Sequence, residues 1–157
     1  MRLENKVAFI SGGGRGMGEV MAKLFAQEGA SVVIGDVLED EGKQVEAAIN
    51  ETGGNCLFVR LNVTDETQWQ QAVAATVTRF GKLDIVVHSI AYANREDLGG
   101  DFSKTNREGF RLALDISAYS LVSIARYGAP LMRGDGGSIL AMTFQASSRV
   151  FPGYNVM

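Results

Sequence analysis

The feature that most constrains this chain is a glycine-rich loop, SGGGRGMG at residues 11–18, between an apolar run and an amphipathic segment. The run at residues 6–11 (KVAFIS) has continuous apolar residues, which is typical of a strand buried on both faces. In the segment 16–28, four apolar residues recur on one helical face: Val20, Met21, Leu24 and Phe25. Gly29 then provides a stop signal. The sequence therefore predicts a strand, a tight glycine turn and a helix.

The rest of the chain repeats this alternation of strand and helix patterns. Further strands are predicted at residues 31–36, 56–61, 83–89 and 137–144. Further helices are predicted at residues 38–52, 64–80 and 105–132, with Thr64 as one N-cap and Thr105 with Glu108 as a capping box. Buried strands joined by right-handed crossovers predict an α/β fold, a Rossmann-type doubly wound parallel sheet in the order 3-2-1-4-5. We expect one domain over residues 1–157.

Composition excludes several classes of protein. Hydrophobic residues make up 46% and charged residues 21%, as in ordinary globular chains, and the net charge of −3 gives no reason to expect nucleic acid or a membrane as partner. No apolar stretch approaches the ~18 residues of a membrane span, and the start lacks a signal-peptide core, so we expect a cytoplasmic protein. The single Cys56 is expected to be a buried apolar residue. No metal site is predicted.

The glycine loop predicts a pyrophosphate site. Glycine permits left-handed backbone angles and lets the main chain approach a phosphate without a Cβ in the way. The helix that follows offers unpaired N–H groups and a partial positive charge. The cofactor-binding residues expected here are Ser11, Gly12, Gly14, Arg15, Gly16, Met17 and Gly18. An ordinary glycine-rich turn is the alternative, but the position between strand and helix favours the phosphate site.

Asp36 predicts which dinucleotide is bound. It ends the second predicted strand, 20 residues after Gly16, where a carboxylate accepts hydrogen bonds from the adenosine ribose. Such a carboxylate repels a 2′-phosphate, so NAD is favoured over NADP, although Arg15 could offset the charge of a phosphate. The alternative is a turn aspartate or a helix cap. Asn62, with Val63 beside it, is expected to bond the adenine edge, or else to satisfy the local backbone of a turn.

The chain resembles two branches of the short-chain dehydrogenase/reductase family. Residues 6 to about 88 resemble the main branch, in KVAFISGGGRGMG, VVIGD, LNVTDETQW and FGKLDIVVHS. From Leu83 onward the chain is similar to the enoyl-acyl-carrier-protein reductases of fatty-acid synthesis, in HSIAYANREDL, DFSKTNREGFRLALDISAYSL, APLM, GGSI and YNVM. The chain thus looks like two relatives joined near residues 83–88, either as a natural mosaic or as an engineered chimera.

The resemblance implies further site residues. It places Ser89, Ile90 and Ala91 along the pyrophosphate and nicotinamide side of the cleft. Tyr154 matches the tyrosine that contacts the substrate thioester carbonyl and stabilises the enolate in enoyl reductases; the alternative is a disordered residue. Phe144 stands where these enzymes have a second tyrosine. The family's lysine, seven residues after the position of Tyr154, lies beyond the last residue of this sequence.

Three functions remain open at this point. The resemblance implies an NAD(H)-dependent oxidoreductase that reduces an enoyl thioester, with Tyr154 as its catalytic residue. The second possibility is a nucleotide-binding module that lacks a complete catalytic set, and the third is a self-associating scaffold fragment. We also expect a homo-oligomer, because the strand at residues 137–144 would be an unpaired edge and the helix at residues 105–132 would expose an apolar face.

Overall fold

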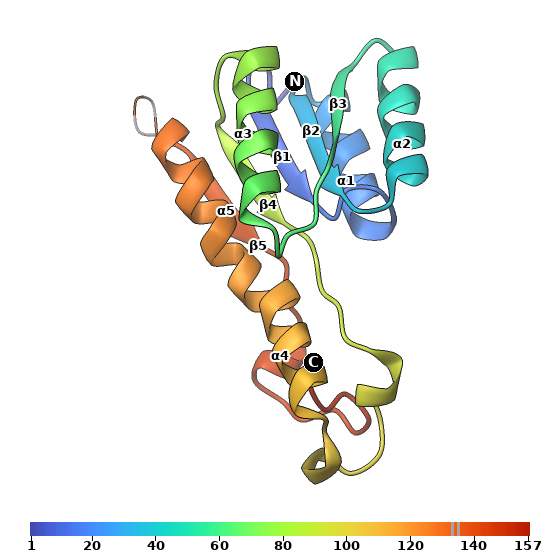
Figure 1. Ribbon diagram of the computed structural model, residues 1–157. Helices are drawn as coiled ribbons and strands as arrows, with labels where there is room; N and C mark the ends of the chain where they lie inside the picture. The colour runs from blue at the N-terminus through green and yellow to red at the C-terminus, as the bar shows by residue number, and fades with distance from the viewer. Residues whose placement is uncertain (133, 135) are drawn as a thin grey trace.

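A single parallel sheet organises the chain, in a computed structural model that describes residues 1–132, 134 and 136–157. Its strand order is β3-β2-β1-β4-β5, which confirms the predicted Rossmann-type doubly wound arrangement (Figure 1). The strands are β1 (Val7–Ser11), β2 (Ser31–Asp36), β3 (Asn55–Arg60), β4 (Ile85–His88) and β5 (Ser138–Ala141). The α-helices are α1 (Gly16–Gln27), α2 (Glu39–Glu51), α3 (Glu66–Phe80), α4 (Arg107–Leu114) and α5 (Ser120–Gly128).

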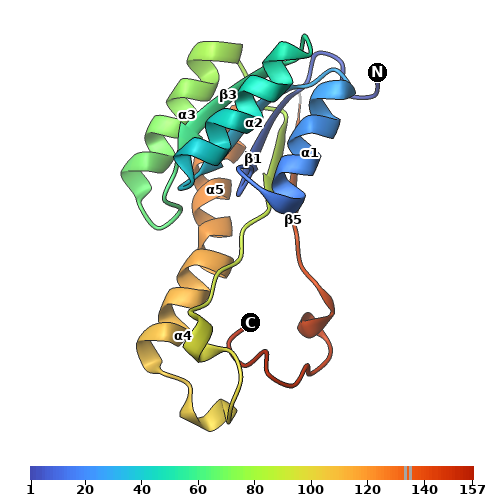
Figure 2. The same cartoon turned by 90° about the vertical axis from the view of Figure 1, so that its right-hand side faces the viewer.

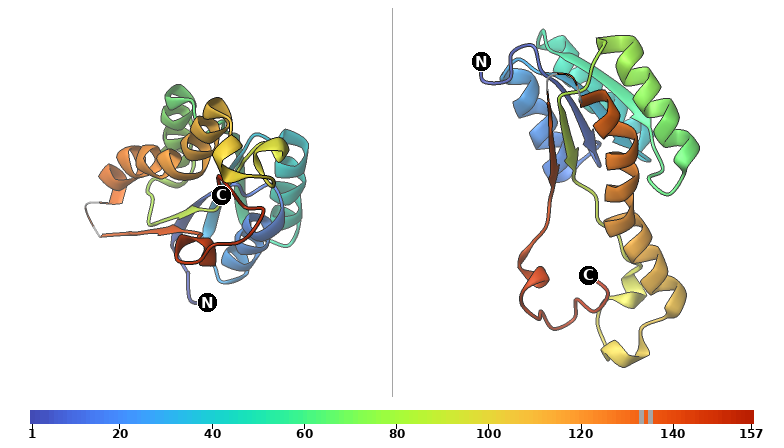
Figure 3. Two further views of the ribbon diagram at one scale, coloured as in Figure 1. Left: turned by 90° about the horizontal axis from the view of Figure 1, so that it is seen from below. Right: turned by 90° about the vertical axis from the view of Figure 1, so that its left-hand side faces the viewer.

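Both faces of the central strands are buried, which explains their continuous apolar runs. Successive side chains of a strand point to opposite faces, so Phe9 packs in a cluster with Trp69 of α3, while Ile10 packs in a second cluster with Ile49 of α2. Helices α1 and α2 cover one face of the sheet, and α3 and α5 cover the other (Figure 3). The carboxyl ends of β1, β2 and β4 consequently meet at one edge of the sheet.

Helix α1 buries a different face from the predicted one. Met21 and Phe25 pack on the core as expected, but Val20 is 64% and Leu24 is 45% exposed. The buried face instead carries Gly18 and Ala22, since their small size lets the helix axis approach the sheet. Of the four residues on the predicted apolar face, Val20 and Leu24 therefore lie largely in solvent.

Two predicted helix caps were one residue too early. Helix α3 is capped by Asp65, whose Oδ1 accepts from the amides of Thr67 and Gln68 at 2.9 and 3.3 Å, whereas Thr64 bonds to Asn62. In the same way, Asn106 caps α4 through its Oδ1, and the predicted cap Thr105 donates to a carbonyl of the preceding turn. In both cases the residue nearer to the first-turn amides provides the acceptor.

The predicted helix at residues 105–132 is a helical rod with an internal irregularity. Helix α4 continues through a π-helical turn, Asp115–Tyr119, into α5 and then a 3₁₀ turn, Ala129–Met132. The π turn is set by the amide of Ser120, which donates to the carbonyl of Asp115 five residues earlier. The rod extends well past the carboxyl ends of the strands (Figure 2). Within the described residues, no helix is long and apolar enough to span a membrane.

Candidate cofactor-binding site

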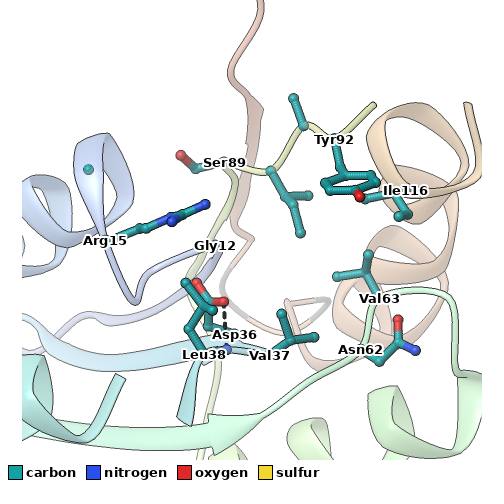
Figure 4. A pocket seen from close by; sticks show the side chains of 13 residues that line it. Gly12, Arg15, Asp36, Val37, Leu38, Asn62, Val63, Ser89, Tyr92 and Ile116 are labelled. Carbon is teal, nitrogen blue, oxygen red and sulfur yellow. Dashed lines mark hydrogen bonds between the residues drawn. The ribbon is translucent and has the colours of Figure 1, made fainter. Parts of the chain in front are cut away.

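A cavity of about 490 Å³ opens at the carboxyl ends of β1, β2 and β4. This is the crevice in which parallel α/β sheets bind ligands, at the point where chain connections leave the sheet in opposite directions. Figure 4 shows the side chains that surround it. The residues that line it are Gly12, Arg15, Gly16, Asp36, Val37, Leu38, Asn62, Val63, Ser89, Ile90, Ala91, Tyr92 and Ile116.

The glycine loop needs glycine for steric reasons. Gly12 and Gly16 have φ angles of +73° and +61°, which disfavour side chains. A Cβ on Gly12 would overlap the carbonyl oxygen of Ser89, and a Cβ on Gly18 would overlap the carbonyl oxygen of Gly12. Gly18 thus lets α1 pack closely against the glycine loop, and Gly12 lies directly against the segment that follows β4.

The loop leaves the start of α1 available to an anion. The amide of Gly12 donates to the carbonyl of Gly35 at 2.8 Å, and the amide of Gly14 donates to Asp36. Among the described residues, however, no side chain caps the first turn of α1, whose N-cap position is Arg15. The first amides of a helix point outward along its axis, so this turn can bind a phosphate through main-chain N–H groups and the helix dipole.

The carboxylate of Asp36 lies at the cavity wall and is 7% exposed. Its Oδ2 accepts from the amide of Gly14 at 2.9 Å, and its Oδ1 accepts from the amide of Leu38 at 3.1 Å (Figure 4). A carboxylate oxygen can accept a second hydrogen bond. Asp36 can therefore hold the loop in place and still accept from the hydroxyls of a ribose.

Asn62 lines the cavity but is already engaged in a turn. Its Oδ1 accepts from the amide of Thr64 at 3.1 Å and from the Thr64 hydroxyl at 2.9 Å. This is the local role that the sequence left open for Asn62, and it leaves the Nδ2 group as a donor to a ligand. Val63 lies beside it as an apolar contact, so this part of the wall suits the edge of a flat heterocycle.

Four predicted cofactor residues support the cavity without lining it. Ser11 is fully buried and bonds to a carbonyl of β4, and Gly14 reaches only the carboxylate of Asp36. Gly18 packs under the loop, and the side chain of Met17 is 66% exposed.

Sequence reasoning missed four lining residues. Val37 and Leu38 directly follow Asp36 at the end of β2, and Tyr92 directly follows the predicted segment 89–91. A rule that includes the residues after each strand end would have found these three. Ile116 comes from the π turn of the helical rod, and no local pattern in the sequence indicates that this turn faces the cavity.

Tyr154 lies outside the cavity lining, in a cluster of three aromatic rings. Its ring centroid is 5.2 Å from that of Phe144 and 6.5 Å from that of Phe151. The side chain is 45% exposed. Asn155, the next residue, donates to the carbonyl of Gly99, which joins this segment to the loop after β4. The aromatic cluster therefore belongs to a segment that contacts the loop around Gly99, and none of its three residues lines the cavity.

Two strand residues, His88 of β4 and Cys56 of β3, have clearly shifted pKa values. Burial lowers the pKa of His88, whose Nε2 lies 2.7 Å from the hydroxyl of Ser120. Burial also raises the pKa of the Cys56 thiol to about 12, as expected for a thiol packed as an apolar residue. In the part of the chain that the structure describes, no three His, Cys, Asp or Glu side chains gather in a way that could hold a metal ion.

The chain is similar to known proteins over its whole length. A family model described as enoyl-(acyl carrier protein) reductase matches residues 12–157, across the point near residues 83–88 where the resemblance changes. The enoyl-(acyl-carrier-protein) reductase (NADH) FabI of Nostoc sp. is 37% identical over 162 residues, which cover all of this chain and 62% of that protein. The chain thus spans less than two thirds of this relative.

Solved structures give the same result. A short-chain dehydrogenase/reductase from Serratia marcescens superposes with a TM-score of 0.89 at 30% identity, over 99% of this chain and 62% of that one. A 7α-hydroxysteroid dehydrogenase, solved with NADH and a 7-oxo bile acid conjugate, superposes with a TM-score of 0.86 at 29% identity, over 97% of this chain and 58% of that one.

Proposed function

The chain belongs to the short-chain dehydrogenase/reductase family, in the branch described as enoyl-(acyl carrier protein) reductase, and we propose that it binds NAD(H). The observation that carries the proposal is the cavity that joins an uncapped helix start to a buried carboxylate. The first turn of α1 holds the pyrophosphate, and Asp36 accepts from the adenosine ribose. The family relatives named above, one an NADH-dependent reductase and one solved with NADH, support the same cofactor.

The arrangement favours NAD(H) over NADP(H). A 2′-phosphate would approach the Asp36 carboxylate, which is buried and tied to two amides and so cannot easily move away. Arg15 lines the same cavity and could attract that phosphate, which makes NADP(H) the second choice. The direct test is to titrate the chain with NADH and with NADPH. The change in nucleotide fluorescence measures binding in each titration. Tighter binding of NADH is expected, and no binding of either nucleotide would overturn the proposal.

The reaction we propose is the reduction of an enoyl thioester. Bound NADH supplies a hydride for the substrate β-carbon. On this chain, Ser89, Ile90 and Ala91 border the nicotinamide side of the cavity, and Tyr154 is the proposed donor of a hydrogen bond to the thioester carbonyl. NADH consumption with a crotonyl thioester tests this step, and a cytoplasmic location is part of the same proposal.

A second candidate is a nucleotide-binding module without turnover. Two observations favour it: Tyr154 packs with Phe144 and Phe151 outside the cavity lining, and Phe144 has no hydroxyl to contribute. The two functions differ in the same pair of assays. NADH binding together with thioester-dependent NADH consumption supports the reductase, whereas binding without consumption supports the module.

We also propose that the chain forms a homo-oligomer, which is the form in which a scaffold role would operate. Strand β5 is an edge strand on which Ile139 is 40% and Leu140 is 52% exposed. Phe110 and Leu114 of α4 and Val122 of α5 are likewise between 42% and 48% exposed on the helical rod. When two chains associate through such an edge, its main-chain groups can pair and its apolar side chains are removed from water, which favours association.

A further inference from the structure

The cavity wall opposite Asp36 is a short segment with few main-chain bonds of its own. Strand β4 ends at His88, and the amide of Ser89 donates to the carbonyl of Ser11 at 3.1 Å. Beyond Ser89 the chain leaves the sheet and runs along the cavity as Ile90 and Ala91. In the described part of the chain, neither residue takes part in a main-chain hydrogen bond. The packing of Ile90 against the core and the hydrogen bonds at the two ends of this wall therefore set its position.

Two serines of the helical rod hold these ends, and we call them the serine clamp: Ser117 and Ser120. The hydroxyl of Ser117 accepts from the amide of Tyr92 at 2.9 Å and donates to the carbonyl of Tyr92 at 3.1 Å. The hydroxyl of Ser120 lies 2.7 Å from Nε2 of His88. One serine thus fixes the main chain at the far end of the wall, and the other fixes a side chain at its start.

The second contact has a defined direction. The hydroxyl of Ser120 donates to the carbonyl of Ile116 at 2.6 Å. A serine hydroxyl has one proton, so Nε2 of His88 carries the proton of the other hydrogen bond and donates to Ser120. Burial lowers the pKa of His88, which agrees with a neutral ring. His88 thus donates to Ser120, and Ser120 donates to the carbonyl of Ile116, in one continuous chain of hydrogen bonds.

The π turn explains why one stretch of helix can do this. Ser117 lies within the turn Asp115–Tyr119, and Ser120 directly follows it. Ile116 of the same turn lines the cavity. The turn therefore supplies one wall of the cavity through Ile116 and fixes the neighbouring wall through the two serines. Figure 4 shows Ile116 and Tyr92 side by side, on the side of the cavity away from Asp36.

We propose that the serine clamp positions the nicotinamide end of the bound dinucleotide. The inference rests on the proposed function, in which Asp36 marks the adenosine end and the segment Ser89–Tyr92 marks the other. Ser117 and Ser120 are positioning residues, because Ser117 acts through the main chain of Tyr92 and Ser120 acts through the side chain of His88. This segment touches the glycine loop at two points, the hydrogen bond from the amide of Ser89 to the carbonyl of Ser11 and the close approach of Gly12 to the carbonyl of Ser89.

The test compares two probes, NADH and ADP, by calorimetric titration of the full chain. ADP carries the adenosine and both phosphates but lacks the nicotinamide. We expect Ser117→Ala to weaken NADH binding about tenfold, because two hydrogen bonds to Tyr92 are lost, and to change ADP binding less than about twofold. Ser120→Ala is expected to show the same selectivity. Ser117→Thr keeps the hydroxyl and should restore NADH binding.

Ser123→Ala is the matched control, since Ser123 is a buried serine on the same helix, one turn beyond the clamp. It should leave both affinities unchanged. Equal losses of NADH and ADP binding in Ser117→Ala would overturn the proposal, since they would indicate general damage to the fold. Unchanged NADH binding in both alanine variants would also overturn it. If the unaltered chain binds ADP and NADH with the same affinity, the clamp has no nicotinamide to position, whereas failure to bind either probe overturns the proposed function itself.

Discussion

The carboxylate of Asp36 accepts a hydrogen bond from the amide of Gly14 at 2.9 Å, which ties the glycine loop to the end of β2. The residue proposed to select the ribose is therefore also a structural support of the phosphate loop. Removing it would affect both roles at once. An informative substitution has to separate the charge of Asp36 from its ability to accept hydrogen bonds.

Asp36→Asn makes this separation in part, because the amide loses the negative charge and keeps one of the two acceptor oxygens, while its NH2 group replaces the oxygen that bonds the second main-chain amide. We expect NADH binding to weaken about tenfold, since a charge-assisted hydrogen bond to the ribose is replaced by a neutral one. NADPH binding should improve as the repulsion of the 2′-phosphate disappears. Fluorescence titration measures both, with Asp40→Asn on the exposed first turn of α2 as control. Unchanged affinities for both nucleotides would remove Asp36 from the site.

Gly18→Ala should destabilise the fold by about 2 kcal/mol, as overpacking at a rigid contact does. The added Cβ would overlap the carbonyl oxygen of Gly12, which belongs to the main chain and cannot rotate away. Urea unfolding followed by circular dichroism gives the free energy of unfolding. Met17→Ala is the control, because the neighbouring side chain is 66% exposed and should tolerate the change. Equal stability of the two variants would contradict the close packing.

The buried thiol of Cys56 should react very slowly in the folded chain. Burial raises its pKa to about 12, so at pH 8 the reactive thiolate is on the order of one ten-thousandth of the population. In about 6 M guanidinium, which is roughly enough to unfold ordinary domains, a thiol reagent such as dithionitrobenzoate should label the protein within minutes. Without denaturant, labelling should be slower by orders of magnitude. Fast labelling of the folded chain would show that Cys56 is accessible.

Stability should fall in acid because of His88. Burial lowers the pKa of this residue in the folded state below its ordinary value of 6.5, so the unfolded chain binds the proton more readily. Its contribution is fully present above the unfolded pKa, and it decreases as the pH falls below about 6.5, with a slope of at most about 1.4 kcal/mol per pH unit. Denaturant unfolding at several pH values between 8 and 5 measures this dependence.

His88→Gln provides the comparison for that series, since it keeps a polar side chain at the same position but does not titrate. Its stability should change less between pH 7 and pH 5 than that of the unaltered chain. Parallel pH profiles of the two proteins would mean that carboxylates elsewhere, rather than His88, cause the acid dependence.

The sheet order and the location of the site could be predicted from the sequence because both follow from local patterns. The continuous apolar run before the glycine loop indicated β1, and the loop predicted a phosphate site at the start of α1. The same reasoning grouped Val20 with Met21 on one apolar face, because helical spacing alone cannot tell a face set by large residues from one set by Gly18 and Ala22. The small residues determined the packing, and Val20 stayed in solvent.

The parts of the site that the sequence did not indicate depend on contacts between distant residues. Ile116 lines the cavity only because the rod contains a π turn, and a single sequence does not show where a helix widens by one residue. Ser117 meets Tyr92 across 25 positions of the chain, so no spacing rule pairs them. Tyr154 was expected at the site by resemblance, and its present contacts are with Phe144 and Phe151.

The chain is expected to self-associate through strand β5 at the edge of the sheet. Leu140 is 52% exposed on a strand whose outer edge pairs with no other strand in the described chain. Light scattering coupled to size-exclusion chromatography should find the unaltered chain larger than its 16.9 kDa monomer. Leu140→Lys should shift the equilibrium toward the monomer, because a charge at an edge strand opposes pairing with a second strand. Val150→Lys, at a fully solvated loop position, should leave it unchanged. A monomer at all concentrations of the unaltered chain would mean that this edge is tolerated in water.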